Sequence, residues 1–230
     1  MEGTIFVLTG AGVSADSGLG TFRDADGIWQ KYDLEMVATP RGFATNTDLA
    51  HDFYNARRRN CRRAEPNAAH FALAALETAL PGEVVIVTQN VDNLHERAGS
   101  RNLIHMHGEL MNALCSGCHH RWPAPDKMHR DDQCPRCGAP KTRPDVVFFG
   151  EYPYFMDEIL DLVGRCETFA SIGTSGEVEP AASLASMAKA NGAKTAHLNI
   201  RYPHPGHPFD DVLIGPASEV VPAWVDSLIG

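Results

Sequence analysis

The chain has 230 residues, of which 43% are hydrophobic and 21% charged, a composition typical of a folded enzyme with one large domain or a large domain and a small insert. Its net charge of -9 argues against general binding to nucleic acid. No apolar run approaches the roughly 20 residues that a membrane helix needs. Because the sequence runs straight into its first strand, with no room for a signal or transit peptide, we predict a cytoplasmic protein with no membrane partner.

A glycine-rich turn opens the chain. An apolar run at residues 5–8 predicts the first strand, and Gly10, Gly12 and Ala15 then fit the loose Gly-x-Gly-x-x-Gly/Ala pattern of a dinucleotide-binding turn. The pattern is weak alone, because a dehydrogenase also has a second strand that ends in an acidic residue about 20 positions further on. An irregular loop at residues 19–29 takes that place here. We therefore expect a dinucleotide site without ordinary hydride chemistry.

Residues 30–45 predict an irregular connection, and the segments 47–64 and 67–80 have the patterns of two helices. The first helix carries a cluster of arginines, most of which are expected on a solvated face. Tyr54 and Arg57 differ from them, because their i, i+3 spacing puts a phenol and a guanidinium on one side of the helix. Such a pair suits a carboxylate ligand, which accepts two hydrogen bonds from the guanidinium and one from the phenol.

A polar cluster follows a buried strand. Residues 84–88, VVIVT, predict a parallel strand that is apolar on both faces. Gln89, Asn90 and Asp92 come directly after it. Ligands of open parallel sheets bind at the carboxyl ends of the strands, so these side chains are site candidates. The alternative is that Asn90 and Asp92 only cap the next helix.

Residues 103–108 predict a short strand that runs into a turn and places His105 and His107 on one face. His107 lies nearer the strand end, where a neutral imidazole suits a general base near pH 7. Gly173, Thr174 and Ser175 form a small polar turn after a later strand, which suits a ribose or a phosphate. The remaining strands are expected at 144–151, 168–172, 195–200 and 211–214, and the remaining helices at 154–164, 180–191 and 218–228.

Four of the six cysteines form two CxxC pairs with fifteen residues between them, the spacing of a four-cysteine zinc site. The predicted ligands are Cys115, Cys118, Cys134 and Cys137. Four thiolates fill a tetrahedral site, so the metal is expected to be structural, and the insert is too small to fold without it. Cys61 and Cys166 are expected to be core or bystander thiols.

Together these elements predict an α/β fold, a Rossmann-like doubly wound parallel sheet of six to seven strands with a small inserted zinc-binding module. Residues 1–230 are interpreted as a single catalytic domain. Its Rossmann-like part is expected at about 1–30, 82–111 and 144–230, its helical segment at about 31–81, and its zinc module at about 112–143. Because no long apolar seam or coiled-coil pattern is present, we expect a monomer.

Several long segments resemble one known family. GAGVSADSG with TFRDADGIW, TQNVDNLHERAG, HMHGEL, the paired CxxC, VVFFGE, GTS and LNI are similar, in this order, to the sirtuin family of NAD-dependent protein lysine deacylases. The resemblance covers about residues 4–225. Tyr54 and Arg57, in FYNARRR, further resemble the bacterial class that removes acidic acyl groups. The resemblance implies a deacetylase and desuccinylase that uses NAD and one structural Zn²⁺, acts on acylated protein lysines, and gives nicotinamide, O-acyl-ADP-ribose and free lysine.

The resemblance also implies residue roles. The acyl oxygen would attack C1′ of the nicotinamide ribose, with Asn90 at the catalytic centre and His107 as general base on a ribose hydroxyl. The implied NAD contacts are Gly10, Ala11, Gly12, Ser14, Phe22, Arg23, Trp29, Gln89, Asn90, Asp92, Gly173, Thr174, Ser175, Asn199 and Ala217. The implied substrate contacts are Tyr54 and Arg57 at the end of an acyl tunnel, and Val146, Phe148, Gly150 and Glu151 along a segment that the peptide joins as a strand.

Three other functions stay open. An NAD-dependent protein ADP-ribosyltransferase would use the same cofactor site but pass ADP-ribose to a protein nucleophile. A zinc-ribbon nucleic-acid binder would use the arginines of residues 57–63 with Arg121, Lys127 and Arg130, although the acidic net charge counts against it. An ordinary dehydrogenase is disfavoured by the missing second strand and its acidic residue.

Overall fold

The computed structural model describes residues 4–20, 32–176 and 178–230. Six parallel strands form the main sheet in the order β3-β2-β1-β7-β8-β9. They are β1 Ile5–Thr9, β2 Val84–Thr88, β3 Leu103–His105, β7 Thr168–Ile172, β8 Lys194–Asn199 and β9 Asp211–Ile214. Counted within this sheet, the order is 3-2-1-4-5-6, that of the doubly wound dinucleotide fold, and it reverses between β1 and β7. The predicted fold class is confirmed.

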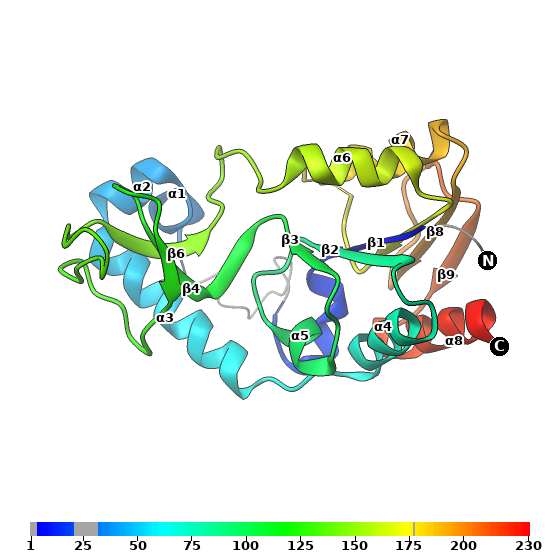
Figure 1. Ribbon diagram of the computed structural model, residues 1–230, viewed down its shortest axis with the longest axis horizontal. Coiled ribbons are helices and arrows are strands. Elements are labelled where there is room, and N and C mark those ends of the chain that lie inside the picture. The colour runs from blue at the N-terminus through cyan, green and yellow to red at the C-terminus, as the bar shows by residue number, and fades with distance from the viewer. Residues whose placement is uncertain (1–3, 21–31, 177) are drawn as a thin grey trace.

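Helices cover both faces of this sheet (Figure 1). On one face lie α6 Met156–Arg165 and α7 Leu184–Ala190, the latter preceded by a 3-10 turn, Ala181–Ser183. On the other lie α4 Ala68–Ala79, α5 Leu94–Ala98 and α8 Ala217–Ile229. Side chains of β1 alternate between the two resulting cores. Phe6 and Leu8 enter the core beneath α6 and α7, while Ile5 and Val7 enter the core beneath α4 and α8.

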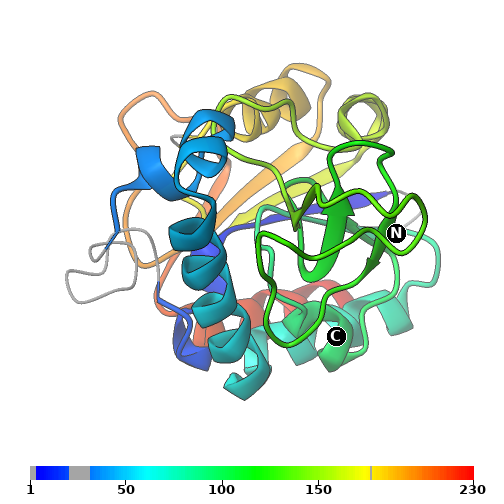
Figure 2. The same ribbon diagram turned by 90° about the vertical axis from the view of Figure 1, so that its left-hand side faces the viewer.

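A second, smaller part lies at the end of the molecule beyond the main sheet (Figures 1 and 2). It contains α1 Leu34–Val37, α2 Pro40–Thr45 and α3 Thr47–Arg63. Beside them lies an antiparallel sheet in the order β5-β4-β6, made of β4 Gly108–Cys115, β5 Arg121–Pro123 and β6 Thr142–Val146. Because β4 begins directly after His107, the main sheet passes straight into this part.

Two sequence predictions are wrong in this part. Residues 30–45 were expected to be irregular, but 34–37 and 40–45 are helical. The Asp33 carboxylate caps α1 by accepting from the Glu35 N–H at 3.0 Å, and the Thr39 hydroxyl caps α2 by accepting from the Gly42 N–H at 2.9 Å. The strand expected at 144–151 begins earlier and ends at Val146. It stops there because the chain turns back on itself, with the Glu151 N–H donating to the Phe148 carbonyl at 2.9 Å.

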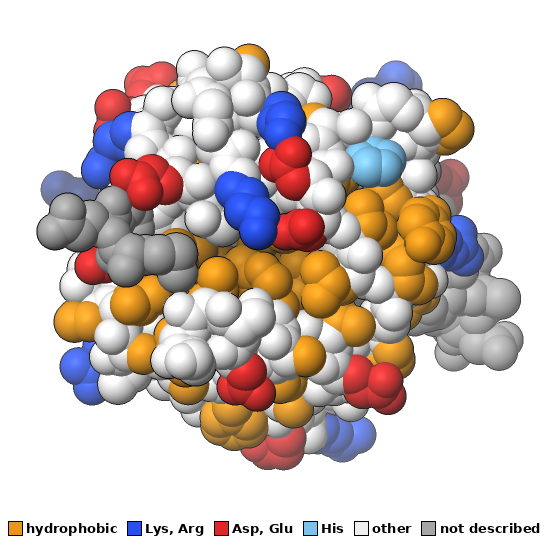
Figure 3. Space-filling model, turned by 90° about the vertical axis from the view of Figure 1, so that its right-hand side faces the viewer, with side chains coloured by type: hydrophobic (Ala, Val, Ile, Leu, Met, Phe, Trp, Pro, Cys, Tyr) orange, Lys and Arg blue, Asp and Glu red, His pale blue; other side chains and the backbone are white. Residues whose placement is uncertain are grey.

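Hydrophobic side chains gather on the end of the molecule away from the small part (Figure 3). Separately, Ile200 and Tyr202 follow the carboxyl end of β8 and are 65% and 77% exposed, and Ile214, the last residue of the edge strand β9, is 40% exposed. Exposed apolar surface of this kind is typical of interaction sites, so the expected monomer stays a prediction. No helix in the described part of the chain is long and apolar enough to cross a membrane.

Candidate active site

Two glycine turns meet where the strand order reverses. After β1 the chain forms two 3-10 turns, Ala11–Val13 and Ala15–Ser17, in place of a long helix. The Gly12 N–H donates to the Gly173 carbonyl at 2.8 Å. A Cβ on Gly12 would lie 2.7 Å from the Gly173 Cα, and Gly173 itself has a φ of +62°. Both positions therefore require glycine, because any side chain there would meet the backbone of the facing turn.

Replacing Gly12 with alanine tests this close packing. Because backbone atoms would have to move apart, Gly12→Ala is expected to lower the free energy of unfolding by about 1–3 kcal/mol. Gly164→Ala in α6 is the matched control, since an added Cβ there meets no atom of the described residues within 4 Å. It is expected to stabilise the protein by up to about 1 kcal/mol. Urea unfolding measures both. Equal stability of the two variants would contradict the packing described here.

The loop after β2 is bonded to the first glycine turn. The Asn90 side-chain amide donates to the Gly10 carbonyl at 3.1 Å and to Ser14 Oγ at 3.2 Å. Ser14 in turn donates to Asp92 Oδ2 at 3.1 Å, and Asp92 Oδ1 accepts from the Leu94 N–H at 3.1 Å. Burial raises the pKa of Asp92, and these two hydrogen bonds oppose the rise. Asp92 thus accepts from the first N–H of α5, although Asn93 is the N-cap residue, and it also joins the polar cluster.

The two histidines of the HMH segment bind consecutive carbonyls of that loop. His107 Nδ1 lies 3.1 Å from the Gln89 oxygen, and His105 Nδ1 lies 3.1 Å from the Asn90 oxygen. A carbonyl can only accept, so Nδ1 carries the proton in both rings. Burial lowers the pKa of His107, although the bond to Gln89 opposes the shift. His107 is therefore neutral near pH 7, with the Nε2 lone pair available to take a proton.

The pKa of His105 is shifted in the opposite direction to that of His107. Its Nε2 lies 2.8 Å from Glu96 Oε1, and the side chain is 8% exposed. Burial alone would lower the pKa of His105, but the Glu96 carboxylate outweighs burial and raises it. His105 donates from both nitrogens only as the imidazolium, which holds the Asn90 carbonyl in place. The sequence prediction missed Glu96, and no local pattern indicates it, because the two residues are nine positions apart.

A third group lies at the ends of β7 and β8. Gln89 Nε2 donates to Thr174 Oγ1 at 2.9 Å, and Asn199 Nδ2 donates to the Thr174 carbonyl at 2.7 Å. The structure thus brings these predicted NAD contacts to one strand edge. Ala217 begins α8, and its side chain is buried in the core beneath that helix. The predicted contacts Phe22, Arg23 and Trp29 lie outside the described residues.

Tyr54 and Arg57 lie one turn apart on α3, as predicted. The Tyr54 ring is 3% exposed and stacks on Phe148 with centroids 5.9 Å apart. The Arg57 guanidinium carbon lies 5.7 Å from the centroid of the Tyr54 ring and 5.6 Å from that of Phe53. Burial raises the pKa of Tyr54 to about 12, against the charge of Arg57. The phenol is therefore a hydrogen-bond donor at neutral pH, beside a cation.

The predicted peptide-binding segment is held by an ion pair. Arg143 donates to Glu151 Oε1 at 2.6 Å and to Oε2 at 2.8 Å, and Oε2 also accepts from the Phe148 N–H at 2.8 Å. The Arg143 guanidinium lies 3.7 Å above the Phe148 ring. Val146 and Phe148 are each 2% exposed, whereas Gly150 is exposed. The structure therefore uses the Glu151 carboxylate to close this turn, a role that the sequence prediction missed.

The four predicted zinc ligands come together. Their sulfur atoms all lie within 4.8 Å of one another, with 3.7 Å between those of Cys115 and Cys137 and between those of Cys118 and Cys134. Four Zn–S bonds of about 2.3 Å in a tetrahedron give sulfur separations of about 3.8 Å. The cysteines therefore fit a structural zinc ion with no open coordination position.

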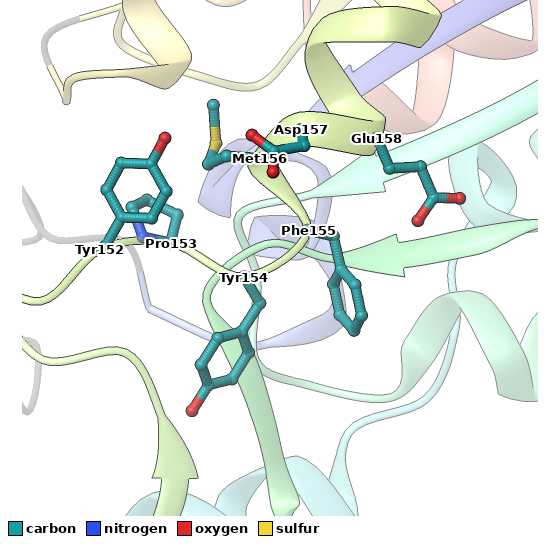
Figure 4. A pocket seen from close by; sticks show the side chains of 7 residues that line it. All are labelled: Tyr152, Pro153, Tyr154, Phe155, Met156, Asp157 and Glu158. Carbon is teal, nitrogen blue, oxygen red and sulfur yellow. The ribbon is translucent and has the colours of Figure 1, made fainter.

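A surface pocket of about 500 Å³ is formed by the segment that follows Glu151. It is lined by residues 152–158, before and within the first turn of α6, where Tyr152, Tyr154 and Phe155 project from the chain (Figure 4). The Tyr154 hydroxyl donates to Asp145 Oδ1 at 3.0 Å. Among the residues that the structure describes, none of the predicted site residues lines this pocket.

A doubly wound sheet with paired glycine turns, a polar loop at the strand ends and a four-cysteine cluster defines an α/β nucleotide-binding enzyme with a structural zinc module. A family model described as the Sir2 family matches residues 10–180. The chain belongs to this family.

Two bacterial relatives, both named NAD-dependent protein deacylase, support this assignment. The protein from Caulobacter vibrioides is 54% identical over 98% of this chain and 96% of its own length. The one from Salmonella typhimurium is 50% identical over 98% of this chain and 84% of its own length.

Solved structures agree. A variant Sir2 homologue in complex with ADP-ribose has a TM-score of 0.90 at 38% identity, and covers 99% of this chain and 92% of its own. A Sir2 homologue in complex with NAD has a TM-score of 0.89 at 39% identity, over 99% and 90%. A Sir2 protein bound to a myristoylated histone peptide has a TM-score of 0.74 at 31% identity, over 98% and 90%.

Proposed function

We propose that this chain is an NAD-dependent protein lysine deacylase that removes acetyl groups and acidic acyl groups, succinyl and malonyl, from lysine side chains. The names of the relatives support the deacylase class, and the histone peptide bound by one neighbour supports protein lysines as substrates. The observation that carries the acyl preference is the pair Tyr54 and Arg57, a phenol donor and a guanidinium stacked on one face of α3.

The residues at the strand edge fit NAD. The two glycine turns leave no room for a Cβ where they meet, and the polar groups of Ser14, Asn90 and Asp92 lie at their side. NAD supplies an ADP-ribosyl group with nicotinamide as its leaving group. We propose that Asn90 and Asp92 orient the nicotinamide ribose. His107 then takes a proton from a ribose hydroxyl at Nε2, while its Nδ1–H stays bonded to the Gln89 carbonyl.

We propose that Tyr54 and Arg57 recognise the far end of the acyl group. A succinyl or malonyl carboxylate would accept two hydrogen bonds from the guanidinium and a third from the Tyr54 hydroxyl. Hydrogen bonds to charged groups contribute about 1.5–3 kcal/mol each. An acetyl group carries no carboxylate to pair with either side chain, so its removal depends on the catalytic residues alone.

Replacing Arg57 with methionine tests this role. Arg57→Met is expected to lower kcat/KM on a succinyl-lysine peptide by about 10- to 100-fold, because the carboxylate loses its cation. On the matching acetyl-lysine peptide the value is expected to stay within about threefold of wild type, since a loss of that size is below 1 kcal/mol. Arg59→Met, at an exposed position of the same helix, is the control. An equal fall on both peptides would remove Arg57 from this role.

The competing functions are less well supported. Three of the arginines that a nucleic-acid binder would use are paired with acids: Arg62 with Asp126, Arg121 with Asp145, and Arg130 with Asp48. An ADP-ribosyltransferase would leave ADP-ribose on a protein, which mass spectrometry distinguishes from O-acyl-ADP-ribose. The monomeric state, the cytoplasmic location and the division into Rossmann-like, helical and zinc segments remain our proposals.

A further inference from the structure

The face of α3 that meets the zinc module is polar. Three contacts recur every seven residues along the helix, which is about two turns. They are the pairs Asp48–Arg130, Asn55–Met128 and Arg62–Asp126. Residues 126–130 therefore run antiparallel to α3, and the two segments lie side by side (Figure 2). We call Asp48, Asn55, Arg58 and Arg62 the polar seam.

Asn55 lies at the centre of the seam and is 1% exposed. Its Nδ2 donates to the Met128 carbonyl at 2.9 Å, and its Oδ1 accepts from the Met128 N–H at 2.9 Å. One side-chain amide thus satisfies both backbone groups of a residue that lies between the two cysteine pairs. A shift of α3 along the module would break both bonds at once.

Arg58 is buried completely, so the solvated face expected for most of these arginines is wrong for this one. In the part of the chain that the structure describes, its three hydrogen bonds all go to neutral acceptors. They are Leu110 O at 2.9 Å, Asn55 Oδ1 at 2.8 Å and Met128 Sδ at 3.3 Å. Burial lowers the pKa of Arg58 to about 10. A buried polar group of this kind adds little to stability, and its best-attested use is to fix register.

The residues of the polar seam lie next to Tyr54 and Arg57, which we call the acyl-recognition pair. Asn55 follows Tyr54 in the sequence, and Arg58 follows Arg57. Arg58 also bonds to Leu110, on the strand that starts directly after His107. Its guanidinium therefore ties the helix with the acyl pair to the strand beside the general base. Recognition by a fork of hydrogen bonds requires placement within about 0.5 Å.

We propose that Asn55 and Arg58 are positioning residues that set acyl selectivity. They fix the rotation and register of α3 against the zinc module and β4, and so the separation between the acyl-recognition pair and His107. The proposal rests on the function assigned above to Tyr54 and Arg57. It makes the contact between α3 and the zinc module part of the selectivity of the enzyme for carboxylate-bearing acyl groups.

The test compares Asn55→Leu and Arg58→Met with Arg59→Met on succinyl- and acetyl-lysine peptides, with zinc content measured in each protein. We expect KM for the succinyl peptide to rise about tenfold, the equivalent of one lost hydrogen bond to a charged group. On the acetyl peptide kcat is expected to stay within about twofold, a change of less than 0.5 kcal/mol. Arg58→Lys, which keeps the cation, is expected to recover part of the loss.

The proposal would be overturned if the ratio of kcat/KM on the succinyl peptide to kcat/KM on the acetyl peptide were the same in Asn55→Leu and Arg58→Met as in Arg59→Met. The double variant Asp48→Asn/Arg62→Gln removes only the exposed ends of the seam, so it serves if the buried variants lose zinc or fail to fold. Its ratio is expected to fall about threefold, as for the loss of two surface ion pairs, and an unchanged ratio would contradict us. Arg57→Met, assayed alongside, identifies failure of the underlying function: if its ratio is also unchanged, the acyl pair itself is wrongly assigned and the seam proposal is overturned with it.

Discussion

His107→Ala is expected to lower kcat on acyl-lysine peptides by about 10²- to 10⁴-fold, the usual contribution of a general base. The neutral ring has its Nδ1–H committed to the Gln89 carbonyl, so Nε2 is the proton acceptor that the variant loses. KM for the peptide is expected to change little, because the imidazole does not hold the substrate. His204→Ala, at an exposed position, is the control. A variant with more than half of the wild-type kcat would exclude His107 as the base.

The pH profile gives a second view of the same residue. Protonation removes the Nε2 lone pair, so kcat/KM of the wild type must fall on the acid side as pH drops through the pKa of His107. Burial lowers that pKa from its ordinary value of 6.5. The acid limb is therefore expected below pH 6.5. A limb above that value would contradict the neutral ring described here.

Cys134→Ser is expected to abolish zinc binding and unfold the module. Structural zinc contributes about 10–16 kcal/mol to the folding of small zinc domains, far more than the short sheet β5-β4-β6 can replace. Loss of the module also takes Met128 away from Asn55 and Arg58, so desuccinylation is expected to fall with it. Metal content by atomic absorption and amide exchange over residues 115–137 measure the two effects.

Cys166→Ser is the matched control for that variant. Its thiol is buried and donates to the Val163 carbonyl at 3.4 Å, outside the cysteine cluster. It is expected to keep one equivalent of zinc and normal exchange. Full zinc content in Cys134→Ser would show that the four thiolates are not the ligand set.

The main sheet was predictable because buried parallel strands are continuous apolar runs. Strands β2, β7 and β9 begin and end where the sequence prediction placed them. The second sheet was not predicted, because β4 and β6 are separated by the zinc insert and pair through long-range contacts. The two short helices before α3 were also missed, since they depend on the side-chain caps of Asp33 and Thr39 and on packing against α3.

Part of the candidate site was also predictable from the sequence, and part was not. Gln89, Asn90 and His107 were predicted to lie at one edge of the sheet because each follows a parallel strand, and the carboxyl ends of parallel strands meet at that edge. The opposite tuning of His105 and His107 could not be predicted, since it depends on Glu96 and on which carbonyl each ring meets. The burial of Arg58 was equally hidden. The helical pattern shows an arginine cluster, but only the fold shows that the zinc module covers one of its members.

Product analysis with NAD and matched peptides separates lysine deacylation from the competing reactions. The protein is incubated with NAD and with succinyl-, acetyl- or unmodified lysine peptides of one sequence, while nicotinamide release and all products are followed by mass spectrometry. From each acylated peptide we predict nicotinamide, O-acyl-ADP-ribose and deacylated lysine in a ratio of one to one to one. We predict no turnover of the unmodified peptide. Nicotinamide release that does not depend on the acyl group, or ADP-ribose attached to protein, would contradict the account.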